Sequence, residues 1–119
     1  MIHTIEELLN LAPVIPVLVI DELADAVPLA TALVEGGLPV LEITLRTPVA
    51  LAAIEAIASQ VPQAMVGVGT VTSTLEMEQS INAGATFAVS PGCTSELATK
   101  AAGFELPYLP GVASPSDVM

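Results

Sequence analysis

Short apolar segments recur along this chain at regular intervals. Runs rich in valine, isoleucine and leucine begin near positions 14, 40, 65, 86 and 106, and stretches with helical periodicity lie between them. An interval of about 20 to 26 residues is typical of strand-helix units on a parallel sheet. The repeat therefore predicts an α/β fold in which each strand is followed by a helix.

Capping and turn residues mark the limits of these elements. Asp21, Thr47, Thr94 and Ser114 precede predicted helices as N-caps, and glycines end three of them. Thr4 opens a short first helix with a capping-box pattern. The expected strands are 14–20, 40–45, 65–70, 86–90 and 106–109; the expected helices are 5–11, 22–35, 48–60, 73–83 and 95–102, with one more opening after residue 114.

Two sheet closures fit this pattern. Five units in about 120 residues suit an open flavodoxin-like sheet, and eight such units make a (β/α)8 barrel of roughly 200 residues or more. Met119 falls in the first turn of the last predicted helix, before any apolar face that could cover the fifth strand. We therefore expect residues 1–119 to be a single truncated unit, the (β/α)4-β5 portion of a barrel.

The second strand carries an unusual polar face. Strict alternation in 41–47 (LEITLRT) places Glu42, Thr44 and Arg46 on one side and leucine and isoleucine on the other. A strand between helices is normally apolar on both faces, so three polar groups on one face indicate a site. The alternative is that Glu42 and Arg46, roughly 13 Å apart by strand rise, are separate structural residues.

The charge balance narrows the possible partners. Two Lys and Arg residues stand against thirteen Asp and Glu residues, a net charge of −11, and such a surface repels nucleic acid and anionic membranes. The placement of a rare cation, Arg46, on the polar strand face therefore points to an anionic ligand. No secretory signal or membrane-length apolar run is evident, so we expect a cytoplasmic protein.

Few residues are available for nucleophilic or metal chemistry. One cysteine, Cys93, excludes an internal disulfide and a cysteine-built metal site, and a lone histidine, His3, excludes histidine-based catalysis. Gly67-Val68-Gly69 lacks the third glycine of a dinucleotide fingerprint, so close backbone packing explains it better.

Several motifs, in order and with their spacing, closely resemble the class I aldolases of 2-keto-3-deoxy-6-phosphogluconate (KDPG) and 4-hydroxy-2-oxoglutarate (KHG). The resemblance spans the whole chain and implies a TIM barrel, usually trimeric, that needs no cofactor or metal. The segments that carry it are 13–17 (PVIPV), 26–30 (AVPLA), 36–37 (GG), 41–47 (LEITLRT), 66–71 (VGVGTV), 83–87 (AGATF), 90–92 (SPG) and 106–112 (LPYLPGV).

The resemblance also implies a reaction and roles for four residues. Family members cleave KDPG to pyruvate and glyceraldehyde 3-phosphate through a lysine Schiff base. By motif match, Glu42 is the general acid/base, Arg46 and Thr70 bind the pyruvyl carboxylate, and Pro91 lines the pocket. These residues fall at the carboxyl ends of expected strands, where barrel enzymes build their sites.

One essential group is missing from this pattern. The family's Schiff-base lysine lies on the sixth strand, beyond Met119, and Lys100 is expected to be an ordinary helix residue. Two hypotheses follow. The chain is the N-terminal portion of a lyase and inactive alone, or it is a non-catalytic or engineered half-barrel that assembles through its sheet edges.

Overall fold

Five parallel strands form one sheet in the computed structural model, which describes residues 4–119. The spatial order of the strands is the same as their order in the sequence. They are β1 (Val17–Leu18), β2 (Val40–Thr44), β3 (Met65–Gly69), β4 (Ala88–Ser90) and β5 (Tyr108–Pro110).

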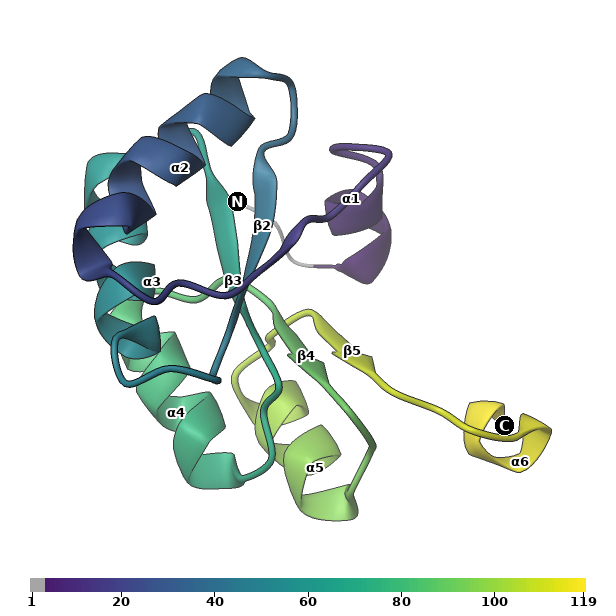
Figure 1. The fold of residues 1–119 in the computed structure, drawn as a ribbon. Coiled ribbons are helices and arrows are strands. Elements are labelled where there is room, and N and C mark those ends of the chain that lie inside the picture. The colour runs from purple at the N-terminus through teal and green to yellow at the C-terminus, as the bar shows by residue number, and fades with distance from the viewer. Residues whose placement is uncertain (1–3) are drawn as a thin grey trace.

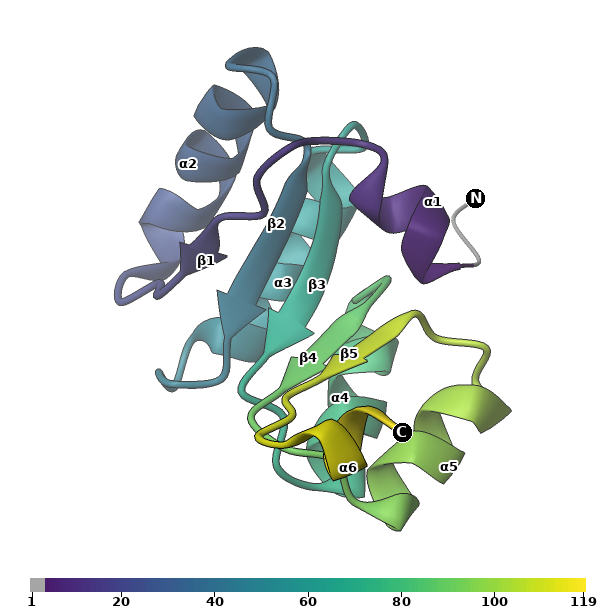
Figure 2. The same ribbon diagram turned by 90° about the vertical axis from the view of Figure 1, so that its right-hand side faces the viewer.

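The connecting helices lie on one face of the sheet. Figures 1 and 2 show α2 (Leu23–Glu35), α3 (Ala50–Gln60), α4 (Thr74–Ala83) and α5 (Ser95–Gly103) along the outer side, with the short α1 (Ile5–Leu9) on the inner side. A flavodoxin-like sheet reverses its strand order and carries helices on both faces. A sheet wound in one direction is instead a portion of a barrel, so the barrel expectation is confirmed.

The main core lies between the strands and these outer helices. Leu41, Ile43, Val66 and Val68 project from β2 and β3 into this layer and are fully or almost fully buried. The helices contribute small and branched apolar residues to it, including Ala26, Ala30, Ile54, Ile57, Met77 and Leu97. Burial of this apolar area from water is the main stabilising contribution to the fold.

A second, smaller core closes the inner face near the amino ends of the strands. Leu8 of α1 packs there with Val40 and Phe87, and all three are fully buried. Gly67 of β3 makes room for the ring of Phe87, because a Cβ at position 67 would overlap the ring carbons. This contact confirms that close packing explains the glycines of β3.

The strands are shorter than the sequence predicts, and local chemistry explains two of the differences. Only Val17 and Leu18 of the expected strand 14–20 pair in the ladder; Pro16 has no N–H to donate, although its carbonyl accepts the Glu42 N–H at 3.0 Å. β3 ends at Gly69 because Thr70 takes a left-handed backbone conformation, with φ of 62°. α6 (Pro115–Val118) is a single turn that extends away from the sheet (Figure 1).

Three predicted caps are confirmed, and two are wrong. Thr4, Thr94 and Ser114 each accept a hydrogen bond from a backbone N–H of the helix that follows. Asp21 does not cap α2, which begins after Glu22 without a side-chain cap. Thr47 does not cap α3 either, because its hydroxyl donates to the Ile20 carbonyl at 2.6 Å.

No helix within residues 4–119 combines the length and hydrophobicity of a membrane span. His3 and the two residues before it lie outside the described residues, so the structure does not test the expectation that the N-terminus has no secretory signal.

Candidate active site

A cleft of about 300 Å³ opens on the inner face, at the carboxyl ends of β2, β3 and β4. The structure brings all four predicted site residues together there, although they come from three different strand ends. The lining residues are Val17, Glu42, Thr44, Arg46, Thr70, Val89, Ser90 and Pro91.

Glu42 is the buried acid of this cleft. The residue is 5% exposed, and its carboxyl group lies against Gly69 of the neighbouring strand β3. Burial raises the pKa of the Glu42 carboxyl above its ordinary value of 4.5, and the positive charge of Arg46 partly offsets this effect. Burial makes the charged form of this carboxyl less favourable than it is in water, so the group is suited to both accepting and donating a proton.

Arg46 lies in the turn just after β2 and is exposed. Within residues 4–119 its guanidinium group forms no ion pair; the only ion pair of the described chain joins Lys100 and Glu78. Arg46 and Glu42 line the same cleft, and the positive charge of Arg46 lowers the pKa of the Glu42 carboxyl, which argues against the alternative that they are unrelated structural residues. The guanidinium group is available to a carboxylate ligand, which it can bind through two parallel hydrogen bonds.

Thr44 shares the polar face but has a structural partner. Its hydroxyl donates to the carbonyl of Leu18 at 3.0 Å, and the residue is 1% exposed. This bond ties β2 to β1 beneath the cleft. Within the described chain, the charged groups of Glu42 and Arg46 form no side-chain hydrogen bond of this kind.

Thr70 and Pro91 border the cleft from the next two strand ends. The left-handed backbone of Thr70 is uncommon for a non-glycine residue, and conformations of this kind concentrate at functional sites. Pro91 follows Ser90, whose hydroxyl donates to the Gly92 carbonyl at 2.6 Å and holds the turn.

Sequence reasoning missed four contributors to this region. Val17, Val89 and Ser90 line the cleft, and Gly69 makes room for the Glu42 carboxyl. Strand parity could have found Val89, since it lies two positions beyond Phe87 and so on the same face. The partner of Gly69 depends on the register between β2 and β3, which no local pattern reports.

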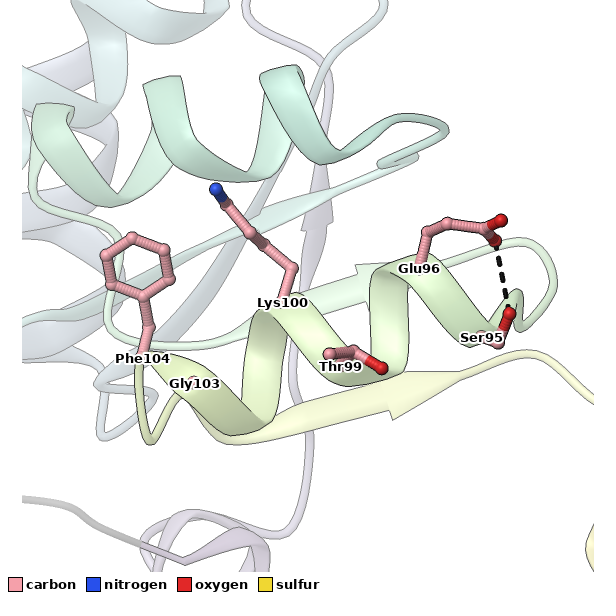
Figure 3. A pocket seen from close by; sticks show the side chains of 6 residues that line it. All are labelled: Ser95, Glu96, Thr99, Lys100, Gly103 and Phe104. Atoms are coloured by element: carbon pink, nitrogen blue, oxygen red, sulfur yellow. Dashed lines mark hydrogen bonds between the residues drawn. The ribbon is translucent and has the colours of Figure 1, made fainter.

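Lys100 lies on the outside of the structure, as expected of a helix residue. Figure 3 shows its side chain directed from α5 toward the neighbouring helix α4, where Nζ lies 2.8 Å from Glu78. Its Nζ is also 5.3 Å from the ring centroid of Phe104. The groove that contains Lys100 lies along α5, on the helix layer rather than at the inner cleft (Figure 3).

The remaining candidates for nucleophilic or metal chemistry are Cys93 and possible clusters of metal ligands. Cys93 is exposed in the loop after β4, where its thiol donates to the Thr94 carbonyl at 3.8 Å and also interacts with the Tyr108 side chain. Among residues 4–119, no three histidine, cysteine or acidic side chains are grouped so that they could hold a metal ion.

The fold and the cleft together define a protein of the TIM-barrel class, with polar groups gathered at the carboxyl ends of parallel strands. A family model described as KDPG and KHG aldolase matches residues 5–119. The chain belongs to this aldolase family.

Individual relatives are similar over part of their length. The 2-dehydro-3-deoxy-phosphogluconate aldolase of Zymomonas mobilis is 53% identical over 115 residues, which cover 97% of this chain and 55% of the relative. The KHG/KDPG aldolase of Escherichia coli is 47% identical over 114 residues, with coverage of 96% and 54%. The chain thus spans about half the length of the curated relatives it matches, and it corresponds to their N-terminal portion.

Solved structures give the same result. The 2-keto-3-deoxy-6-phosphogluconate aldolase of Zymomonas mobilis with 3-phosphoglycerate superposes with a TM-score of 0.91 at 53% identity, covering 96% of this chain and 54% of that one. The KDPG aldolase of Legionella pneumophila, with pyruvate captured as a covalent carbinolamine intermediate, has a TM-score of 0.87 at 50% identity, with coverage of 92% and 53%. The five strands therefore match about half of a KDPG aldolase barrel.

Proposed function

We propose that residues 1–119 form one truncated unit that supplies the acid/base and carboxylate-binding part of a KDPG/KHG aldolase. The observation that carries this proposal is the shared cleft, in which Glu42, Arg46, Thr70 and Pro91 meet at the strand ends. A buried acid beside an unpaired cation fits a reaction that moves protons on a substrate bearing a carboxylate.

In the proposed reaction, a lysine amine condenses with the C2 carbonyl of the substrate and releases water. Glu42 takes the proton from the C4 hydroxyl as the C3–C4 bond breaks, and the bonding electron pair moves into the iminium to form an enamine. The aldehyde product then leaves. Glu42 returns a proton to C3, and hydrolysis of the resulting imine releases pyruvate and the free amine.

Burial suits Glu42 to this double role. A raised pKa brings the carboxyl closer to neutral pH, where a group can both accept and donate a proton efficiently. Arg46 and the Thr70 hydroxyl hold the pyruvyl carboxylate, while Pro91 contributes an apolar wall. Pyruvate and KDPG are the proposed ligands, with no nucleic acid or membrane partner.

The lysine must come from outside residues 1–119. Lys100 is the only lysine in the chain, and it is paired with Glu78 on the helix layer. The chain alone is therefore proposed to be inactive as an aldolase. Activity requires the remaining barrel strands, whether in the same polypeptide or in another chain, and the complete protein is proposed to be a cytoplasmic trimer.

The direct test is a chimera that joins this chain to the C-terminal remainder of the Zymomonas mobilis relative. We expect retro-aldol cleavage of KDPG or 4-hydroxy-2-oxoglutarate, measured as pyruvate release. A chimera that folds cooperatively but releases no pyruvate from either substrate would contradict the proposal.

A second candidate is a half-barrel without catalytic function that assembles through its sheet edges. The observation in its favour is the apolar surface at the edge strand β1, where Val17 is 60% exposed, and just after it, where Val19 is 47% exposed. Unpaired apolar edges recruit other strands. The two candidates are distinguished by whether the chimera is active.

A further inference from the structure

Gly69 lies directly against the carboxyl group of Glu42. A Cβ at position 69 would stand 2.6 Å from both Cδ and Oε1 of Glu42, and 2.8 Å from its Cγ. Non-bonded carbon atoms in good contact are about 3.5–4.0 Å apart. Any side chain at position 69 is therefore incompatible with the observed position of Glu42.

This glycine is required for space rather than for backbone freedom. The glycines of the described chain that have a positive φ are Gly37 and Gly84, so the backbone of Gly69 is open to other residues. Its carbonyl accepts the Leu45 N–H at 3.0 Å, a ladder bond that a side chain would leave intact. Other residues are excluded at position 69 only because there is no space for a side chain.

The neighbouring glycine on the same strand face provides a comparison. Gly67 lies two residues earlier, and a Cβ there would overlap the ring of Phe87, which is fully buried in the inner core. Gly67 thus serves packing, whereas Gly69 is in contact with the acid of the cleft. The two glycines are alike in strand position and differ in what they touch.

The contact keeps the Glu42 side chain against the sheet and largely buried. Glu42 is 5% exposed even though it borders an open cleft, because the bare backbone of β3 lets the carboxyl lie close to the strand. Among the cleft-lining residues, Arg46 is the only other charged group; the remainder are valines, threonines, a serine and a proline. The protonation of Glu42 is therefore governed by its burial and by Arg46.

We propose that Gly69 is a positioning residue for Glu42: the absence of a side chain at position 69 sets the carboxyl against β3, and a methyl group there moves the carboxyl outward into the cleft. The proposal rests on the proposed function only in treating Glu42 as the proton-transfer group. The displaced atoms are the far end of a flexible side chain, so the substitution Gly69→Ala shifts Glu42 without dismantling the sheet.

The test is an NMR titration of the 119-residue chain labelled with ¹³C at glutamate side chains. The Glu42 signal is identified by its loss in Glu42→Gln. We expect Gly69→Ala to lower the titration midpoint of Glu42 relative to the unsubstituted chain, because a carboxyl in the cleft is better hydrated. Gly92→Ala is the matched control, since a Cβ at position 92 meets no atom within 4 Å, and it leaves the midpoint unchanged.

An unchanged midpoint in a folded Gly69→Ala chain would overturn the proposal. If Gly69→Ala does not fold well enough to titrate, thermal unfolding of the double variant Gly69→Ala/Glu42→Ala decides. The proposal predicts a smaller loss of stability than the sum of the two single losses, because the second substitution removes the group that the methyl meets. Simple additivity would overturn it. An inactive chimera would contradict the proposed function and leave either of these results unaffected.

Discussion

The hydroxyl oxygens of Ser90 and Tyr108 lie 2.6 Å apart and join the end of β4 to β5. The Ser90 hydroxyl donates to the Gly92 carbonyl at 2.6 Å, and the Tyr108 hydroxyl donates to the same carbonyl over a longer 3.5 Å. The Gly111 N–H also donates to the Ser90 carbonyl at 2.8 Å. Strand β5 therefore holds the turn that places Pro91 at the rim of the cleft.

Removing the Ser90 hydroxyl should destabilise this turn. Ser90 is 3% exposed, and Ser90→Ala removes the 2.6 Å hydrogen bonds to the Gly92 carbonyl and the Tyr108 hydroxyl, which keep only their longer contact with each other at 3.5 Å among these three groups. We expect a loss of about 1–3 kcal/mol in the free energy of unfolding, measured by urea denaturation. Ser59→Ala on the exposed face of α3 is the control and should change stability by no more than about 0.5 kcal/mol. Equal losses of stability in Ser90→Ala and Ser59→Ala would show that the hydrogen bonds of the Ser90 hydroxyl do not stabilise the fold.

Substitutions of the two charged cleft residues should have different kinetic effects in the chimera. Glu42→Gln should lower kcat by about 10²-fold or more, because proton transfer occurs only in the transition state. Arg46→Ala should mainly raise KM, since a carboxylate clamp acts on the bound substrate as well. Steady-state pyruvate release measures both. A kcat within about twofold of the unsubstituted chimera would rule out Glu42 as the acid/base.

The isolated chain should not form a Schiff base. After incubation with pyruvate and borohydride, mass spectrometry should detect no added three-carbon unit, because Lys100 is paired with Glu78 and located on the helix layer, away from the cleft. The chimera is the positive control and should gain one such unit. Trapping on Lys100 in the isolated chain would contradict the assignment of the site.

The stability contributed by Glu42 should depend on pH with a defined sign. Its folded pKa is raised above the ordinary 4.5 by burial, so between the two pKa values the folded state binds more protons than the unfolded state. The contribution of Glu42 to the free energy of unfolding is therefore largest at pH values below the pKa of the unfolded state. This contribution is lost as the pH rises through the pKa of the folded state. Glu42→Gln should gain stability relative to the unsubstituted chain as pH increases across that range, measured by denaturation at several pH values. A gain that grows toward acid pH would contradict the raised pKa.

The β1 edge should promote self-association of the isolated chain. Light scattering should detect species larger than the 12.1 kDa monomer, because the outer edge of β1 has no strand partner within the described chain and the side chains of β1 are apolar. Val19→Lys should reduce this association, since a charged side chain disfavours strand addition. Leu75→Lys is the matched control, as Leu75 is 63% exposed on α4 and away from the edge. A monomer with a cooperative melt would contradict assembly of the isolated chain through the β1 edge.

The sequence by itself determined which face of strand β2 each side chain occupies. The alternation in 41–47 separates Leu41 and Ile43 from Glu42, and the structure places the first two in the helix-side core and the third in the cleft. This prediction succeeds because successive strand side chains point to opposite faces whatever surrounds them. The strand-helix repeat and most of the helix caps succeed for the same reason, since each depends on residues close together in the chain.

Tertiary structure decided the features that depend on distant partners. Thr47 has the sequence context of a helix cap, but its hydroxyl donates to the carbonyl of Ile20, 27 residues earlier. The choice between barrel and open sheet was settled by strand order, and the contact between Gly69 and Glu42 by the register of β2 and β3. Local sequence patterns specify which face a side chain occupies. Which group it meets there is set by non-local pairing, because the same face can be brought against different neighbours by a different strand order or register.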